Sequence, residues 1–181
     1  MASIQTYFLG PTSHAPNSGL PIIHYRGVLP EPLTEESVTE FLTRDRWGKM
    51  GQGTWGHIAI RHFHPNSHEC YGIFQGSSTL LLGVGGGDQV GGLEVDVRAG
   101  DVIVLPAGTA HSCAKSSKDY RYIGVYPQGC SRWRNEMGSK PIDFASLREE
   151  TENVAMPEAD PVYGVGGPLM QLWRRPEKAK L

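Results

Sequence analysis

The chain has 181 residues, of which 39% are hydrophobic and 20% are charged, as is typical of one globular domain with a sizeable core. Its 17 basic and 19 acidic residues give a net charge of −2, which argues against a nucleic-acid-binding surface. No apolar run approaches the roughly 20 residues that span a bilayer. The first residues lack the basic and apolar regions of a secretory signal.

Cysteine usage bears on the cellular location. The three cysteines are odd in number and form no Cys-x-x-Cys pair; they are Cys70, Cys113 and Cys130. We therefore expect no disulfide framework and a reducing, cytoplasmic location. The last three residues, Ala179-Lys180-Leu181, resemble the peroxisomal signal whose best-known form is Ser-Lys-Leu, so a peroxisomal location is the alternative.

Residues 1–53 are predicted to form an N-terminal arm that contains one strand and one helix. Prolines interrupt the first part, and the strand candidate is Pro21–Tyr25. The helix is predicted over 34–48, with Thr34 as its N-cap and Gly48 as its end. Its apolar face consists of Val38, Phe41 and Leu42.

Residues 54–130 change to a period of two, which predicts the core of a barrel. Short alternating runs are separated by Gly or Pro, and no helix lies between them; the runs are 54–64, 69–76, 77–84, 93–100, 101–106, 111–115 and 120–127. This pattern indicates an all-β antiparallel sandwich or barrel. Residues 131–181 are predicted to be a tail that wraps the barrel, which makes 1–181 a single domain.

Histidines gather in the predicted barrel. His62 and His64 are two residues apart on a strand candidate, so both are expected on one face. The same face carries small or apolar residues that suit a barrel interior; these are Gly56, Ile58 and Ile60. Glu69 begins the next strand and His111 begins a later one. Imidazoles and a carboxylate that converge in this way suit a divalent transition metal with open positions.

The spacing of these residues resembles the two cupin motifs. The first reads Gly56, five residues, His62, one residue, His64, four residues, Glu69, six residues, Gly76. The second reads Gly100, five residues, Pro106, one residue, Gly108, two residues, His111, and its last position, usually Asn, is Lys115. Stretches such as HFHPNSHECYGIFQGSSTLLLG and MPEADPVYGVGGPLMQLW resemble the YjlB-like branch, and this likeness covers roughly residues 5–173.

The resemblance implies a single-domain monocupin with a jelly-roll barrel. It further implies one divalent metal, Fe, Mn, Ni or Zn, bound by His62, His64, Glu69 and His111. Histidine and carboxylate ligands do not select among these metals.

Two alternatives to this ligand set remain. The barrel could be vestigial, with hydrogen-bonded histidines in place of a metal site. His68 could also replace His62 as the partner of His64, although the motif spacing favours His62, and a pocket or solvated position is the other interpretation of His68. His57 is expected on the opposite side from His62.

Three further residues are candidates for a pocket. Cys113 and Lys115 share the face of His111 by period two, so both are predicted to point inward. Lys115 is a candidate catalytic cation or proton donor beside Glu69, or a side chain that reaches solvent. Cys113 is more readily a small core residue, and Tyr71 continues the face of Glu69 as a pocket or core residue.

These observations predict a metal-dependent enzyme that acts on a small organic substrate. Dioxygenase chemistry and isomerase or lyase chemistry are both compatible with the expected site. The alternative is a non-catalytic cupin that stores or senses a metal or metabolite. A homodimer is expected, in which the strand around Pro21–Tyr25 adds to the edge of a partner's sheet.

Overall fold

The computed structural model describes residues 3–50 and 53–174. The C-terminal tripeptide considered as a peroxisomal signal therefore lies outside the described residues. The elements in chain order are β1 (Ser3–Tyr7), β2 (Ile22–Arg26), α1 (Glu35–Thr43), β3 (Trp47–Gly48), β4 (Thr54–Trp55), β5 (Glu69–Gln75), β6 (Ser77–Leu82), β7 (Leu93–Arg98), β8 (Val102–Leu105), β9 (His111–Ser116), β10 (Arg121–Pro127), α2 (Phe144–Glu152) and α3 (Pro168–Leu172).

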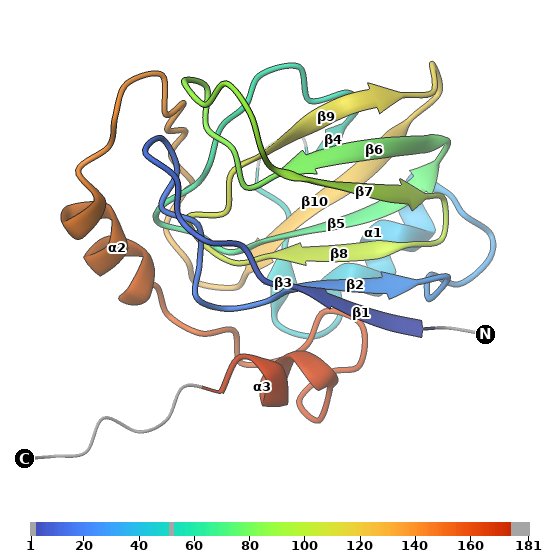
Figure 1. The fold of residues 1–181 in the computed structure, drawn as a ribbon. Helices are drawn as coiled ribbons and strands as arrows, with labels where there is room; N and C mark the ends of the chain where they lie inside the picture. Colours follow the sequence, from blue (N-terminus) through green and yellow to red (C-terminus); the bar gives the residue numbers. More distant parts are fainter. Residues whose placement is uncertain (1–2, 51–52, 175–181) are drawn as a thin grey trace, which may run out of the picture.

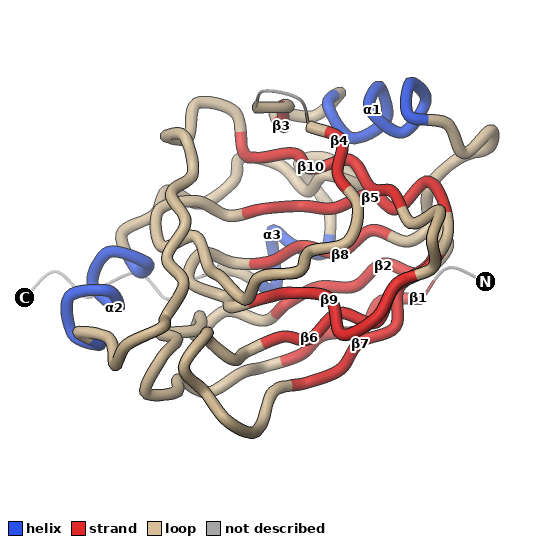
Figure 2. The backbone as a smooth tube through the Cα atoms, turned by 90° about the horizontal axis from the view of Figure 1, so that it is seen from above, coloured by secondary structure: helices blue, strands red, loops and turns tan. Residues whose placement is uncertain are grey.

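The strands form two antiparallel sheets that face each other, as Figures 1 and 2 show. The larger sheet has the order β1-β2-β8-β5-β10-β3, with β4 also paired to β10, and the smaller has the order β7-β6-β9. Non-sequential neighbours such as β8 and β5 are typical of a jelly roll. The predicted all-β, jelly-roll fold is confirmed, and the runs predicted from residue 69 onward all become strands.

The two larger apolar clusters lie on opposite faces of the larger sheet. Side chains alternate along β5, so Tyr71 and Ile73 enter the cluster between the two sheets, whereas Cys70 enters the cluster beneath α1 and α3. All of β5 up to Ile73 is buried, which explains its nearly continuous apolar sequence.

Helix α1 begins as predicted but ends earlier. Thr34 is the N-cap, and its hydroxyl accepts from the amide of Ser37 in a capping box. The predicted end at Gly48 is wrong, because the helix stops at Thr43. Trp47 is only 2% exposed and pairs with β10, and the positive φ of Arg46 turns the chain into that strand. Burial of the indole thus overrides the continuing helical pattern.

The N-terminal strand candidate forms, but it pairs within its own chain. β2 lies between β1 and β8, and the register pairs Ile23 with Val104. The specific expectation that this segment adds to a partner's sheet is therefore wrong. β1 is the strand at the end of the sheet, and Ile4 on it is 43% exposed.

The segment predicted as a strand over 54–64 is regular only at Thr54–Trp55. Beyond β4 it follows β9 through separate contacts, in which the Cys113 amide donates to the Ile58 carbonyl and His62 forms an isolated bridge with His111. Ile60 was expected to face the barrel interior and is 65% exposed, so that expectation is wrong. Without a continuous partner strand, strict alternation does not hold here.

The C-terminal segment contains two helices that composition did not reveal. Leu169 of α3 and the following Trp173 are buried against the larger sheet. Asp160 is fully buried; it accepts from the Tyr25 hydroxyl at 2.5 Å and from the Leu169 amide at 2.9 Å, which ties the segment to β2. Among the described residues, no helix has the length and apolarity needed to cross a membrane.

Candidate metal centre

The four predicted ligands come from three segments at one end of the barrel. Glu69 is the first residue of β5, and His111 is the first residue of β9. His62 and His64 lie on the segment between β4 and β5. Two backbone bonds join this segment to β9: the His111 amide donates to the His62 carbonyl at 2.8 Å, and the His62 amide donates to the His111 carbonyl at 3.2 Å.

The three imidazoles converge. One ring nitrogen of each of His62, His64 and His111 lies within 4.8 Å of the other two. The rings of His64 and His111 are buried, whereas His62 is half-buried. The cluster therefore meets solvent on the side of His62, and the structure brings together the three histidines that the sequence singled out.

Backbone carbonyls fix the tautomer of each ring. The Nδ1 atoms of His62, His64 and His111 lie 2.9, 3.0 and 3.0 Å from the carbonyl oxygens of Ile60, Arg134 and Thr109, respectively. A carbonyl can only accept, so each Nδ1 carries a hydrogen and donates it. In a neutral ring the Nε2 atom then keeps its lone pair. Three such lone pairs facing one point are the donor set of a metal ligand cluster.

Glu69 completes the cluster. Its Oε2 atom lies 3.4 Å from Nε2 of His64 and 3.5 Å from Nε2 of His111. Two phenols also bind it, because the Tyr71 hydroxyl donates to Oε2 at 2.5 Å and the Tyr126 hydroxyl donates to Oε1 at 2.6 Å. A carboxylate that is only 5% exposed requires this many partners to remain charged.

The protonation states follow from burial and from this carboxylate. Burial lowers the pKa of His111 to about 3, with a further contribution from nearby His62, and burial is also the largest cause that lowers the pKa of His62. Burial lowers the pKa of His64 as well, but the adjacent Glu69 carboxylate outweighs it, and that pKa is raised. Burial raises the pKa of Glu69, and the histidines, His64 first, outweigh it and hold that pKa well below its usual range.

A divalent transition metal fits these residues. Without a cation, the convergent Nε2 lone pairs of His62 and His111 face each other and a buried carboxylate, which is unfavourable. Neutral imidazoles with one carboxylate suit Fe, Mn, Ni or Zn and not the all-oxygen sites of Mg or Ca. His62, His64, Glu69 and His111 are the side chains that would hold the metal.

The remaining predicted residues separate into near and distant ones. Tyr71 lies at the centre, since its hydroxyl is 2.9 Å from Nε2 of His111. His68 is buried and turned away from the cluster; its Nδ1 accepts from the Ala107 amide at 3.0 Å, and its ring packs on Trp173. The interpretation that His68 is solvated is therefore wrong. His57 is exposed and bonds Ser116, away from His62, as expected.

Cys113 points inward, but Lys115 does not. Cys113 lies in the cluster between the sheets, which agrees with the core interpretation. The register pairs Leu80 with Cys113 and the preceding Thr79 with Lys115, so β9 contains an extra residue at Ala114. This β-bulge reverses the alternation, and Lys115 is exposed. The prediction that Lys115 faces the metal centre is wrong for that reason.

Two aromatic residues of the centre were missed. Tyr126 follows Tyr122 and Gly124 by period two on β10, so alternation could have placed it inward. Trp133 had no comparable signal. Its ring lies 5.4 Å from that of His64, and its Nε1 atom is buried without a hydrogen-bond partner among the described residues.

The segment that carries Trp133 is hydrogen-bonded to the segment that carries His62 and His64. Phe63 and Glu136 form an isolated bridge, with the Phe63 amide donating at 2.9 Å and the Glu136 amide at 3.0 Å. Asn66 donates to the Arg132 carbonyl at 2.9 Å and accepts from the Arg134 amide at 3.0 Å. The C-terminal segment therefore sets the orientation of His64 as well as covering it.

Comparisons with known proteins agree with this geometry. A family model described as Cupin matches residues 58–129. The uncharacterised protein YjlB of Bacillus subtilis is 28% identical over 170 residues, which are 93% of this chain and 96% of that protein.

Solved structures with detectable similarity are more distant. A conserved protein of Klebsiella pneumoniae with a double-stranded β-helix domain is 14% identical, covers 77% of this chain and 80% of its own, and has a TM-score of 0.36. An 11S globulin from Wrightia tinctoria is 13% identical with a TM-score of 0.35; the match covers 75% of this chain but 27% of the globulin. The family model over residues 58–129, the similarity to YjlB and the convergent histidines all agree with the resemblance of this chain to cupins.

Proposed function

We propose that this protein is a metal-dependent enzyme that acts on a small organic substrate, with dioxygenation as the first reaction class. One observation carries the proposal: backbone carbonyls orient three converging imidazoles, and two of them, His64 and His111, lie 3.4 and 3.5 Å from the Oε2 atom of a buried glutamate. A bound transition metal would supply Lewis acidity or oxygen activation there. The half-buried His62 marks the side from which a substrate would approach.

The positions of the spare side chains favour dioxygenation over isomerase or lyase chemistry. Proton transfer needs a group that exchanges a proton near neutral pH and is not itself a ligand. Lys115 is outside the barrel and His68 is turned toward Trp173. Burial raises the pKa of Tyr71 well above its usual value, so this phenol can donate a hydrogen bond but is a poor base. Isomerase or lyase chemistry would have to use Tyr71 as its proton relay.

The non-catalytic alternative also has support. Neither of two prominent surface cavities, one lined by Lys115 and the other by Cys130, contains a metal ligand. The interior beside the cluster is filled by Tyr71 and Tyr122, whose ring centroids are 4.3 Å apart. A site with little free space next to it suits a protein that stores or senses a metal.

Oxygen consumption separates these functions. The Fe(II)-loaded protein is given a panel of enol and phenolic compounds, with and without O₂, beside the matched variants His64→Ala and His57→Ala. We expect oxygen uptake that His64→Ala abolishes and His57→Ala retains. Turnover that is undiminished without O₂ would favour isomerase or lyase chemistry. A full metal load with no turnover of any compound would favour storage or sensing.

A further inference from the structure

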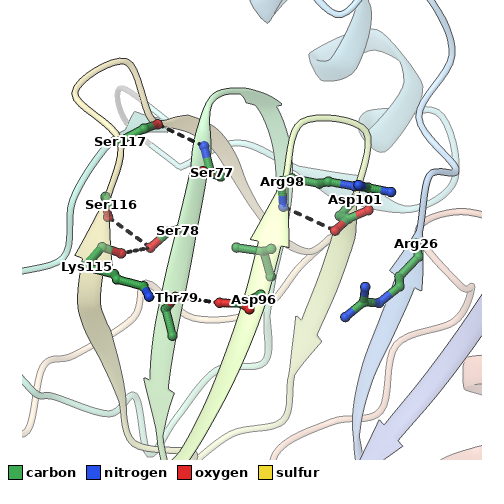
Figure 3. Close-up of a pocket in the computed structure, with 11 residues that line it drawn as sticks. Arg26, Ser77, Ser78, Thr79, Asp96, Arg98, Asp101, Lys115, Ser116 and Ser117 are labelled. Atoms are coloured by element: carbon green, nitrogen blue, oxygen red, sulfur yellow. Dashed lines mark hydrogen bonds between the residues drawn. The ribbon is translucent and has the colours of Figure 1, made fainter.

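A polar groove of about 610 Å³ lies at the end of the barrel opposite to the metal centre. The β6–β9 ladder shows the separation, because Leu82 pairs with His111 at the metal end, whereas Ser78 pairs with Ser116 at the groove. Figure 3 shows the groove running from β9 across β6 and β7, with Arg26 of β2 at its far side. It shares no residue with the metal centre.

Three basic side chains line the groove: Lys115, Arg98 and Arg26. Lys115 and Arg98 are exposed, and in the described part of the chain neither forms an ion pair. The Nε atom of Arg26 donates to Gln5 at 2.9 Å, which fixes this side chain and leaves its terminal N–H groups for another partner. The groove thus presents three cations that are not paired with an anion of the described residues.

The two carboxylates in the groove are already engaged by the protein. Asp101 is buried and accepts from the Gly27 amide at 2.9 Å, with Nε2 of His24 at 3.1 Å. Asp96 accepts from the Thr79 hydroxyl at 2.5 Å, as drawn in Figure 3. Asp101 is directed into the fold, whereas Asp96 is exposed. The three basic side chains outnumber these two carboxylates, so the net charge of the lining is positive.

The remaining lining consists mainly of hydroxyl groups. Serines of β6 and β9 bind one another, as where Ser78 and Ser116 lie 2.9 Å apart, and each hydroxyl oxygen retains capacity to bind a ligand. Val97 is the one apolar side chain among the lining residues that the structure describes. Such a wall offers little to an apolar molecule and suits one that carries hydroxyl groups of its own.

We propose that this groove binds a small, soluble organic phosphate, a phosphate ester of a hydroxylated molecule. The guanidinium groups of Arg98 and Arg26 match the paired oxygens of a phosphate, and Lys115 adds a compact charge. The serine and threonine hydroxyls would bind the polyol part. The volume falls within the roughly 300–1,000 Å³ of small-molecule sites and exceeds what a bare phosphate ion fills.

Isothermal titration calorimetry of the full chain tests this proposal, with glucose 6-phosphate as the probe. Glucose and inorganic phosphate, which are the two parts of this ester, are titrated separately as controls. We expect saturable binding of glucose 6-phosphate, weaker binding of inorganic phosphate and none of glucose, with affinity falling as salt is raised. Lys115→Met and Arg98→Met should each weaken binding about tenfold, and Lys140→Met, an exposed lysine outside the groove, should not.

Three outcomes would overturn the proposal: the ester shows no saturable binding, the groove variants bind it as tightly as the wild type does, or inorganic phosphate binds more tightly than the ester. Vesicles containing phosphatidylinositol 4-phosphate form a further arm, and groove-dependent binding to them without binding of the soluble ester would overturn the claim of a soluble ligand. Metal content is measured in each variant as well. Because the groove lies apart from the metal ligands, the groove variants should keep the metal content of the wild type, so a failure of the groove proposal can be told from a failure of the metal centre.

Discussion

The two ends of strand β9 differ in almost every physical respect. At its start, His111 is 2% exposed, has its Nδ1 hydrogen committed to a carbonyl, and faces two other imidazoles and a carboxylate. Near its end, Lys115 is exposed on the outer face. One barrel strand thus presents a buried, neutral imidazole and a solvated cation four residues apart, because a bulge changes which face a residue occupies.

The largest expected effect is the loss of metal from the buried end. Elemental analysis of the purified protein should give about one transition metal per chain. His62→Ala, His64→Ala and His111→Ala should each lower metal affinity by roughly 100-fold or more, since losing a ligand costs more than losing its outer partner.

His57→Ala and His68→Ala are the matched controls for that experiment, because neither ring belongs to the cluster. Their metal content should equal that of the wild type. If His68→Ala empties the site and His62→Ala does not, the ligand assignment is wrong. A protein that takes up no Fe, Mn, Ni or Zn would remove the metal centre altogether.

The two phenols that bind Glu69 come next. Tyr126→Phe and Tyr71→Phe each remove the phenol donor from one carboxylate oxygen, so we expect metal affinity to fall roughly 10- to 100-fold while the fold persists. Tyr163→Phe, a half-exposed tyrosine away from Glu69, should change nothing. A competition assay with a chelator measures the affinities. Unchanged values in both variants would show that Glu69 needs neither phenol.

The bulge itself can be removed. Deletion of Ala114 would place Lys115 directly after the inward Cys113, so strict alternation would keep Lys115 paired with Thr79 on the outer face. We expect the free energy of unfolding to change by less than about 1 kcal/mol, because the deleted residue is exposed and has no partner in the ladder. Urea unfolding followed by circular dichroism compares the variant with the wild type. A loss of more than about 2 kcal/mol would contradict the assignment of Ala114 as the extra residue.

An effect of pH is expected at the groove end. Burial raises the pKa of Asp101, but hydrogen bonds from His24 and the Gly27 amide outweigh it and hold that pKa below its ordinary value of 3.8. The folded state therefore binds this proton less readily than the unfolded state. The resulting stability is present above pH 3.8 and is lost as pH falls through the lower, folded pKa.

Asp101→Asn tests that linkage. The variant should be less stable than the wild type at pH 7, by about 1 to 3 kcal/mol, and the difference should shrink below pH 4. Glu94→Gln, an exposed acid on the neighbouring strand β7, is the control. A stability difference that stays constant from pH 7 to pH 3 would contradict the assignment.

The last prediction concerns assembly at the sheet edge. Since β2 is paired on both sides, we expect a homodimer to form through β1. Ile4 on this strand is 43% exposed, and Phe8, which directly follows it, is 72% exposed. Size-exclusion chromatography with light scattering should give twice 19.8 kDa. Ile4→Lys places a charge on the edge strand and should shift the dimer toward monomer. A wild-type monomer at high concentration would remove this proposal.

Much of the barrel followed from local sequence because its strands are short apolar or alternating runs, most of them bounded by Gly or Pro. The bounds of β5, β6 and β10 lie within two residues of the predicted runs. The segment around Ile60 was mispredicted as strand, since regular strand structure needs a continuous hydrogen-bonded partner that the sequence does not specify. The helices α2 and α3 were missed because Pro, Gly and charged residues surround them.

The period of two in the sequence predicted an all-β sandwich or barrel, because alternation is a local property. The resemblance to the cupin motifs implied the jelly roll and the set of His62, His64, Glu69 and His111. The tertiary structure alone decided the direction of Lys115, since a bulge is defined by pairing with β6. It also decided the tautomer of His64, which depends on a carbonyl 70 residues away at Arg134. Contacts between distant segments decide such details, and no local pattern encodes them.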